Sequence, residues 1–338
     1  MAMGARTRAG KIAASPLALT ALCLALTLGS AFWGISAISP CDIWLPGSPD
    51  AEIFWRLRLP RAVAAFCVGA GLAMSGMAFQ ALFRNPLATP FTLGVSSGAA
   101  LGASIYFWLG AGLSFLGSSG SLVAALAGGL LSMVLVYGIT RARGGFSTTV
   151  MLLAGVVISF FFASLVTLIQ YLSGVQDSLR IMHWLMGSFS GLEIPRLADL
   201  AFVVTAGALI LHRLAPEIDL LCAGEELAAS RGMRVARGKI LIFAVSSLMV
   251  GTTVSLAGPI GFVGMMLPHI CRMVLGWNHR RLLPAVFVTG GCFVALADLV
   301  SRVILAPAEM PVGIITALIG GPFFLWTLFR SHRGGDMF

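Results

Sequence analysis

Long uninterrupted apolar runs recur along the whole chain and constrain its fold more than any other feature. Hydrophobic residues make up 58% of the 338 residues, and only 10% are charged. Soluble proteins average roughly a quarter charged residues, and a soluble domain has to meet water on its outer faces. The outer faces of this chain must therefore meet lipid, which predicts an integral membrane protein.

The apolar runs also predict the architecture. A helix crosses a bilayer in about 20 mostly apolar residues, and continuous runs of this length indicate helices. We therefore expect an all-α membrane protein, a single polytopic domain over residues 1–338. Its expected membrane-spanning helices, about ten in number, lie near residues 17–38, 62–83, 91–113, 119–140, 149–172, 197–215, 240–258, 260–276, 283–304 and 311–329. The first run is longer than the apolar part of a signal peptide, about 7–15 residues, so we expect it to be retained.

The basic residues predict the orientation. Ten crossings place both termini on one side, which then receives 16 lysines and arginines, whereas the other side receives 6. Cytoplasmic loops carry the excess of basic residues, so both termini are predicted to be cytoplasmic. The net charge of +9 is therefore mostly a topology signal. Nucleic-acid binding is not expected, because the arginines are scattered over short loops.

One charge-dense segment, within the predicted cytoplasmic loop 216–238, has the signals of a short helix. Glu225 and Glu226 stand where the helix would begin, and negative charge is favourable at that end of the helix dipole. Arg231 falls near the other end, and Gly232 suits the position just past it. A helix of about two turns is marginal in water, so this one needs a surface to lie on.

The chain has no signature of a metal or nucleotide site of its own. Its six cysteines include no CxxC spacing, so neither a metal site nor a disulfide framework is indicated. A P-loop requires GxxxxGK[ST], but both Gly-Lys pairs, 10–11 and 238–239, are followed by Ile. We expect no bound cofactor and no enzymatic activity, so any ATP-driven work would have to come through a partner.

A proton-coupled carrier is the alternative from another class. Ionisable residues inside spans mark ion and proton paths, but the predicted spans contain few. Asp298 and Arg302 are four residues apart and are expected to pair on one helix face. No ladder of acids and histidines crosses the predicted membrane, which disfavours this alternative.

Four ordered segments carry a resemblance to a known family. They are RLRLPRAVAAFCVGAGLAMSGMAFQALFRNPLATPFTLGVSSGAALGA (56–103), GEELAASRGM (224–233), GPIGFVGMMLPHICRMVLG (258–276) and EMPVGIITALIGGPFF (309–324). The chain resembles the FecCD/BtuC-like permeases that import iron–siderophore complexes, haem and vitamin B12. The resemblance implies a homodimeric type II ABC importer permease in the bacterial inner membrane. Its implied partners are two ATPase subunits and a periplasmic binding protein.

The resemblance also implies roles for particular residues. In the family, the loop between spans six and seven docks in a groove of the ATPase. The residues of this chain that match it, and so are implied to couple the permease to the ATPase, are Gly224, Glu225, Glu226, Leu227, Ala228, Arg231 and Gly232. Arginines at three positions receive glutamates of the binding protein, which here are Arg58, Arg61 and Arg302. Asp298 holding Arg302 in place is a structural alternative for that arginine.

The resemblance places the gate between spans four and five, where Ser147, Thr148 and Thr149 lie. Capping of the fifth helix explains these residues equally well. Arg180 and His183 follow span five, where a route for haem or an anionic chelate would pass, but they also suit an amphipathic helix at the interface. A ferric siderophore is the expected cargo, with haem and cobalamin as alternatives.

Overall fold

The computed structural model describes residues 16–34, 38–45, 47–110, 120–142, 147–190 and 194–331. Every regular element within these ranges is helical, as the sequence predicts. The elements are α1 (Pro16–Phe32), η2 (Asp42–Trp44), α2 (Pro49–Glu52), η3 (Ile53–Arg58), α3 (Leu59–Phe83), α4 (Val95–Leu109), α5 (Gly120–Ala142), α6 (Thr148–Leu172), α7 (Val175–Leu185), α8 (Ile194–Arg213), α9 (Ala215–Ala223), α10 (Glu225–Ser230), α11 (Val235–Ala257), α12 (Val263–Leu275), α13 (His279–Val303) and α14 (Val312–Ser331).

A helix lies at each of the ten ranges where a span is predicted. Five helices of the described chain are long and apolar enough to cross a membrane, and the bent pair α8–α9 makes a sixth. The apolar helices at the first, third, eighth and tenth ranges are shorter, such as Val263–Leu275. The number of crossings therefore stays a prediction, and residues 35–37 and 111–113 of two predicted spans lie outside the described residues.

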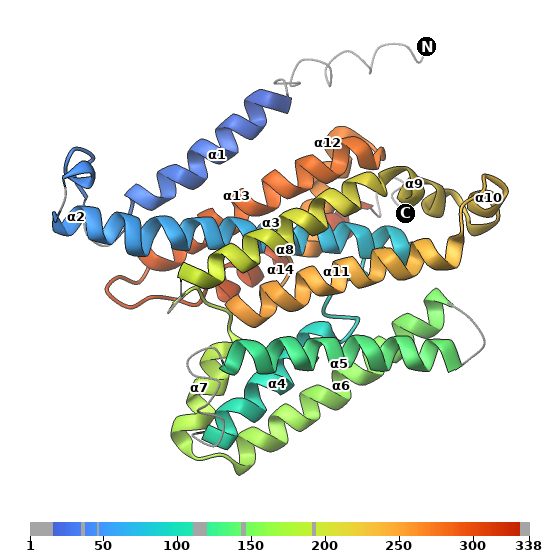
Figure 1. Ribbon diagram of the computed structural model, residues 1–338, viewed down its shortest axis with the longest axis horizontal. Coiled ribbons are helices and arrows are strands. Elements are labelled where there is room, and N and C mark those ends of the chain that lie inside the picture. The colour runs from blue at the N-terminus through green and yellow to red at the C-terminus, as the bar shows by residue number, and fades with distance from the viewer. Residues whose placement is uncertain are drawn as a thin grey trace.

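The helices form two groups, and α3 belongs to the larger one. α3 runs through the larger group and packs against α13, α11, α12, α8 and α1, while α4, α5, α6 and α7 form the second group below it (Figure 1). α11 joins the groups, because it packs against α3 and α8 on one side and against α5 and α4 on the other. α3 lies almost wholly inside protein, and its Gly- and Ala-rich sequence leaves room for close neighbours.

Glycines set the closest helix contacts. A Cβ on Gly98 would lie 2.3 Å from the carbonyl oxygen of Gly128, and one on Gly102 would lie 2.0 Å from that of Ala124. α4 and α5 therefore touch backbone to backbone. Between membrane helices lipid supplies no hydrophobic drive, so close packing of small residues is a main source of association.

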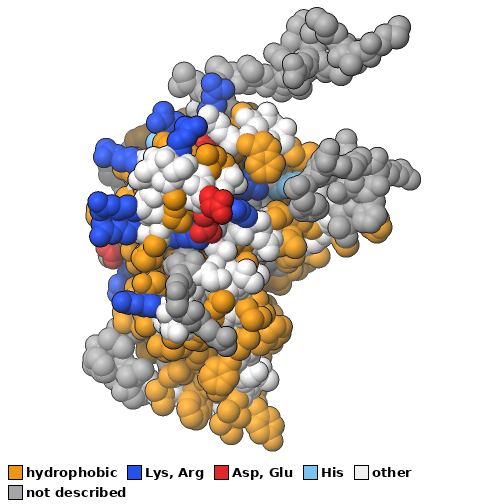
Figure 2. All heavy atoms as spheres, turned by 90° about the vertical axis from the view of Figure 1, so that its right-hand side faces the viewer, with side chains coloured by type: hydrophobic (Ala, Val, Ile, Leu, Met, Phe, Trp, Pro, Cys, Tyr) orange, Lys and Arg blue, Asp and Glu red, His pale blue; other side chains and the backbone are white. Residues whose placement is uncertain are grey.

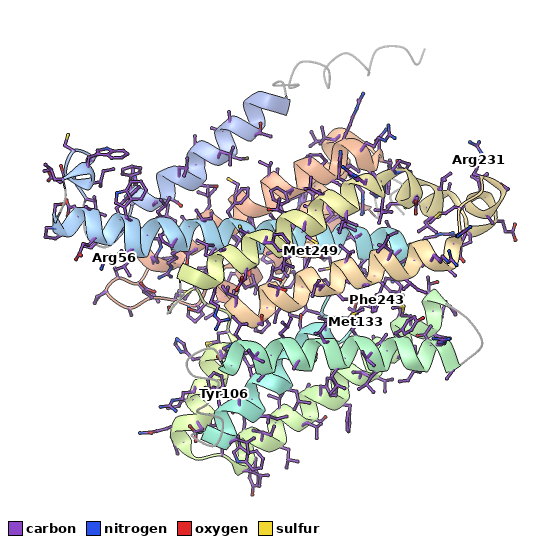
Figure 3. All side chains as sticks on the ribbon, in the orientation of Figure 1. Arg56, Tyr106, Met133, Arg231, Phe243 and Met249 are labelled. Carbon is purple, nitrogen blue, oxygen red and sulfur yellow. The ribbon has the colours of Figure 1, made fainter. Side chains whose placement is uncertain are left out.

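Polar residues collect at the two ends of the helices. Arg56 lies at the end where α2 and the α13–α14 connection are found, and Arg231 lies at the opposite end beside α10 (Figure 3). Figure 2 faces the α10 end, where lysine and arginine side chains gather with a few acids above a broad apolar surface. This grouping matches the predicted alternation of loops, although Arg6, Arg8, Lys11, Arg143 and Arg333 lie outside the described residues.

Candidate functional site

The predicted loop 216–238 folds as two short helices that follow a bend. The axes of α8 and α9 differ by 56° at this break, and α9 carries a proline in its first turn. Gly224 separates α9 from α10 and has a φ of +142°, a conformation that L side chains rarely adopt. We call α9, Gly224 and α10 the α9–α10 unit.

The predicted short helix and its glycine end are confirmed as local structure. Gly232 has a φ of +85°, and its N–H donates to the carbonyl of Ala229 at 2.9 Å. The N–H of Met233 donates to the carbonyl of Ala228 at 3.0 Å. These two bonds form the Schellman arrangement that ends many helices.

α10 has an inner and an outer face. Ala228 is completely buried, whereas the side chain of Leu227 is 43% exposed on the other side. Glu226, Ser230 and Arg231 are also exposed. The outer face therefore offers one apolar side chain surrounded by polar groups of both charges, a composition that suits contact with another protein.

Side chains from α11, α13 and the end of α3 contact the α9–α10 unit on the side away from its exposed face. Lys239 Nζ of α11 lies 2.6 Å from Glu225 Oε1. Asp219 Oδ1 of α9 lies 2.5 Å from His279 Nδ1 at the start of α13. Arg84, at the end of α3, donates from Nε to the carbonyl of Leu221 at 2.8 Å, and this bond adds a third attachment.

Sequence reasoning did not identify Lys239, Asp219 or His279 as parts of this site. Lys239 did offer a signal, because it immediately precedes an apolar span, and a lysine that becomes buried there must be paired. The partner was not evident from the sequence, since Glu225 lies 14 residues earlier beyond a turn.

At the other end of the molecule, Arg61 and Arg302 converge on one buried acid. The side chain of Asp298 is 1% exposed, and its Oδ1 lies 3.0 Å from Arg61 Nη2. Asp298 Oδ2 lies 3.1 Å from Arg302 Nε, which confirms the expected pairing four residues apart on α13. Arg61 also bonds Glu309, with 2.8 Å between Nη1 and Oε2. The sequence gives no sign that Glu309 is a partner, because it lies 248 residues from Arg61.

Arg58 is attached to the first helix instead. Its Nη1 donates to the carbonyl of Phe32 at 3.0 Å, and its guanidinium leaves no room for a side chain at Gly34. All three predicted docking arginines thus have structural contacts within one subunit. Their contact with a binding protein stays a prediction.

Glu309 lies in the connection between α13 and α14, where it links two elements. Partial burial raises the pKa of its carboxyl, but hydrogen bonds from Arg61 and Ser190 and the charge of Arg61 outweigh that effect, so the pKa lies below its usual value. Glu309 is therefore anionic at neutral pH and bridges Arg61 to Ser190, whose Oγ donates to Glu309 Oε2 at 3.3 Å.

The predicted gate and pathway residues lie at opposite ends of the molecule. Ser147 caps α6, since its Oγ accepts from the N–H of Val150 at 3.5 Å, and Thr148 and Thr149 form the first turn. The capping explanation is confirmed for Ser147, and a gate role stays a prediction for all three residues.

Arg180 and His183 project from α7 toward a cavity. The cavity measures about 470 Å³ and is lined by Phe107 of α4, by Leu179, Arg180, His183 and Trp184 of α7, by Ser188 and Ser190 after α7, and by Leu256 and Ala257 of α11. Arg180 also pairs with Asp177 at 3.4 Å, with both side chains exposed. This placement supports an amphipathic α7 at the end of the molecule opposite α10 (Figure 1), and a substrate route through it stays a prediction.

Among the residues that the structure describes, no group of three or more His, Cys, Asp and Glu side chains has the geometry of a metal site.

Comparison with known proteins identifies the family. Residues 18–330 match the FecCD transport family. The hemin transport system permease protein HmuU of Yersinia pestis is 36% identical over 318 residues, which cover 93% of this chain and 95% of that protein. The vitamin B12 import system permease protein BtuC of Escherichia coli O157:H7 is 38% identical over 320 residues, which cover 94% of both.

A solved structure has the same fold over nearly the whole chain. It shows a metal-chelate type ABC transporter in an inward-facing conformation, and it aligns with a TM-score of 0.84 at 32% identity. The alignment covers 93% of this chain and 98% of that one. The chain therefore belongs to the FecCD transport family and is the permease subunit of a type II ABC importer.

Proposed function

We propose that this permease imports a ferric chelate, of the iron–siderophore type, from periplasm to cytoplasm by alternating access. It would work as a homodimer in the bacterial inner membrane with both termini cytoplasmic. Two separate ATPase subunits would hold ATP and Mg, and a periplasmic protein would deliver the cargo. In this arrangement the chain binds no nucleotide itself and catalyses no covalent step.

The α9–α10 unit is the observation that carries this proposal. A transporter driven by a separate ATPase needs a rigid element that faces the cytoplasm and is connected to the membrane helices. α10 presents an exposed outer face, and the Lys239, His279 and Arg84 contacts tie the unit to α11, α13 and α3. A proton-coupled carrier has no need of such an element.

The proposed cargo rests on the solved relative, which is a metal-chelate type transporter of the same fold. Haem and cobalamin are the alternatives, because HmuU and BtuC are relatives of similar identity. Sequence identity to these two does not separate the three cargoes, so the substrate has to be measured.

The test is ATP hydrolysis by the complete importer in liposomes, with its ATPase and binding protein and one of three cargoes: a ferric hydroxamate siderophore, hemin or cyanocobalamin. We expect the ferric siderophore to stimulate hydrolysis most. Stimulation by hemin or cyanocobalamin alone would overturn the proposed cargo but not the transporter class.

The same assay tests the coupling face with Glu226→Arg. Reversing this exposed charge should lower stimulated hydrolysis by about tenfold, because like charges across an interface weaken docking. The variant should remain monodisperse in detergent, since Glu226 is exposed. Unchanged stimulation in that folded variant would remove α10 from the ATPase interface.

A further inference from the structure

Lys239 is almost fully buried, although it belongs to a turn with exposed basic neighbours. Its side chain is 2% exposed, whereas Arg234, Arg237 and the α10 end of the loop are open to solvent. Burying an ammonium group is costly unless a carboxylate and hydrogen bonds compensate. Glu225 supplies the carboxylate at 2.6 Å and is itself 47% exposed.

The pair closes a loop that folds α10 back onto α11. Glu225 is the first residue of α10, directly after Gly224, and Lys239 lies in the first turns of α11. Between them, Gly232 reverses the chain, and the Met233 side chain packs so closely on Gly238 that a Cβ there would lie 2.4 Å from Met233 Cε. Glu225 at the start of α10 is thus paired with α11, and Met233, beyond the end of α10, packs against α11.

α11 contacts both groups of helices, so a displacement of α10 that moves α11 would reach both groups. It packs against α3, α8, α5 and α4. A mobile charge pair on the surface would absorb such a displacement through side-chain motion. Lys239 has little of that freedom, because its side chain is 2% exposed and the Glu225 carboxylate compensates its burial.

We propose that Lys239 is a positioning residue for coupling: its ion pair with Glu225 fixes the docking helix to α11 and so transmits ATPase movement to the membrane helices. This inference rests on the proposed function of the α9–α10 unit. It assigns a role to a residue outside the exposed docking face, acting through Glu225.

The experiment compares Lys239→Met, Glu225→Gln and the double variant in the reconstituted importer. Methionine keeps much of the length of lysine without its charge. Each single change should lower binding-protein-stimulated ATP hydrolysis by about tenfold, the upper range for residues that couple sites. The double variant should be no worse than either single one, because both remove the same interaction.

Two further variants separate coupling from mere stability. Lys239→Arg keeps the positive charge and should restore most of the stimulated hydrolysis. Arg237→Met removes a neighbouring positive charge from the exposed side of the same turn and should leave stimulation unchanged. If either single variant fails to fold, the double variant decides the matter, because it removes both charges and leaves no buried ammonium without its carboxylate.

The outcomes distinguish this inference from the proposed function. Wild-type protein that fails to bind the ATPase would overturn both. Wild-type coupling with unchanged coupling in the folded Lys239→Met and Glu225→Gln variants would overturn the inference alone. Additive losses in the double variant would also overturn it, because the two residues would then act separately.

Discussion

Asp298 is a buried acid that lies between two arginines. Its carboxylate is 1% exposed and contacts the guanidinium groups of Arg61 and Arg302. Arg302 also donates to the carbonyl of Ser30 at 3.3 Å, so the cluster connects α13 to α3 and α1. Without this carboxylate Arg302 would lose its ion-pair partner, whereas Arg61 would keep Glu309.

Replacing Asp298 with Asn should therefore destabilise the folded protein. Removing one partner of a buried ion pair costs about 3–5 kcal/mol, and here the buried guanidinium of Arg302 would lose its carboxylate. We expect a clearly lower melting temperature in detergent. Glu52→Gln is the matched control, because Glu52 pairs with Arg56 at 3.6 Å with both side chains mostly exposed, and such pairs contribute about 0–1 kcal/mol. Equal melting temperatures of the two variants would contradict this account.

Residue contacts were predictable only where they are local in sequence. The Asp298–Arg302 pair follows from helical spacing, and the glycine end of α10 follows from turn chemistry. The Arg61–Asp298 bond joins residues 237 positions apart, and the Glu309 bond joins residues 248 apart. Charge pattern alone identifies no partner at such distances, because several acids and arginines on the same side are equally compatible.

At the scale of elements, the contact between α4 and α5 is set by the absence of side chains. Gly98 and Gly128 face each other so closely that a Cβ on Gly128 would lie 2.1 Å from the Gly98 carbonyl oxygen. Gly138, also on α5, has no atom within 4 Å of its Cβ position. Gly98 and Gly128 therefore leave no room for a side chain, whereas Gly138 does.

Gly98→Ala and Gly138→Ala make a matched pair of substitutions. Gly98→Ala should separate α4 from α5 and cost roughly 1–3 kcal/mol, the usual range for overpacking. Gly138→Ala should be neutral or stabilise by up to about 1 kcal/mol through helix propensity. Unfolding of both variants in detergent measures the difference. A Gly98→Ala variant as stable as wild type would show that the helices separate without cost.

The long helices were predictable, and their extensions and bends were not. The length of an apolar run reflects the thickness of the bilayer. Such a run therefore locates a helix, but it does not show how far the helix continues into the polar sequence beside it. The helical stretch before α3 begins at Pro49, whereas the predicted span begins at residue 62. α9 fell inside a predicted loop, because its nine residues and the bend before it depend on packing against α3 and α13.

At the scale of the whole molecule, charge is confined to two ends and the sides are apolar. Exposed apolar side chains run along α6 and α14, as Phe160 and Leu318 illustrate, with exposed fractions of 72% and 64%. Such surfaces are expected to face lipid or a second copy of the chain. Lysine and arginine side chains gather with few acids at the end that carries α10 (Figure 2), and the sequence assigns 16 basic residues to that side of the predicted membrane and 6 to the other.

This asymmetry predicts the orientation in the cell, because basic loops stay in the cytoplasm. Arg231→Cys and Arg56→Cys place single thiols at opposite ends (Figure 3), once the exposed Cys41 and Cys222 are replaced by Ser. A membrane-impermeant maleimide applied to spheroplasts should label the cysteine at position 56 and should reach position 231 only after permeabilisation. Labelling of position 231 in intact spheroplasts would place α10 outside, where no ATPase could dock, and would refute the coupling role together with the orientation.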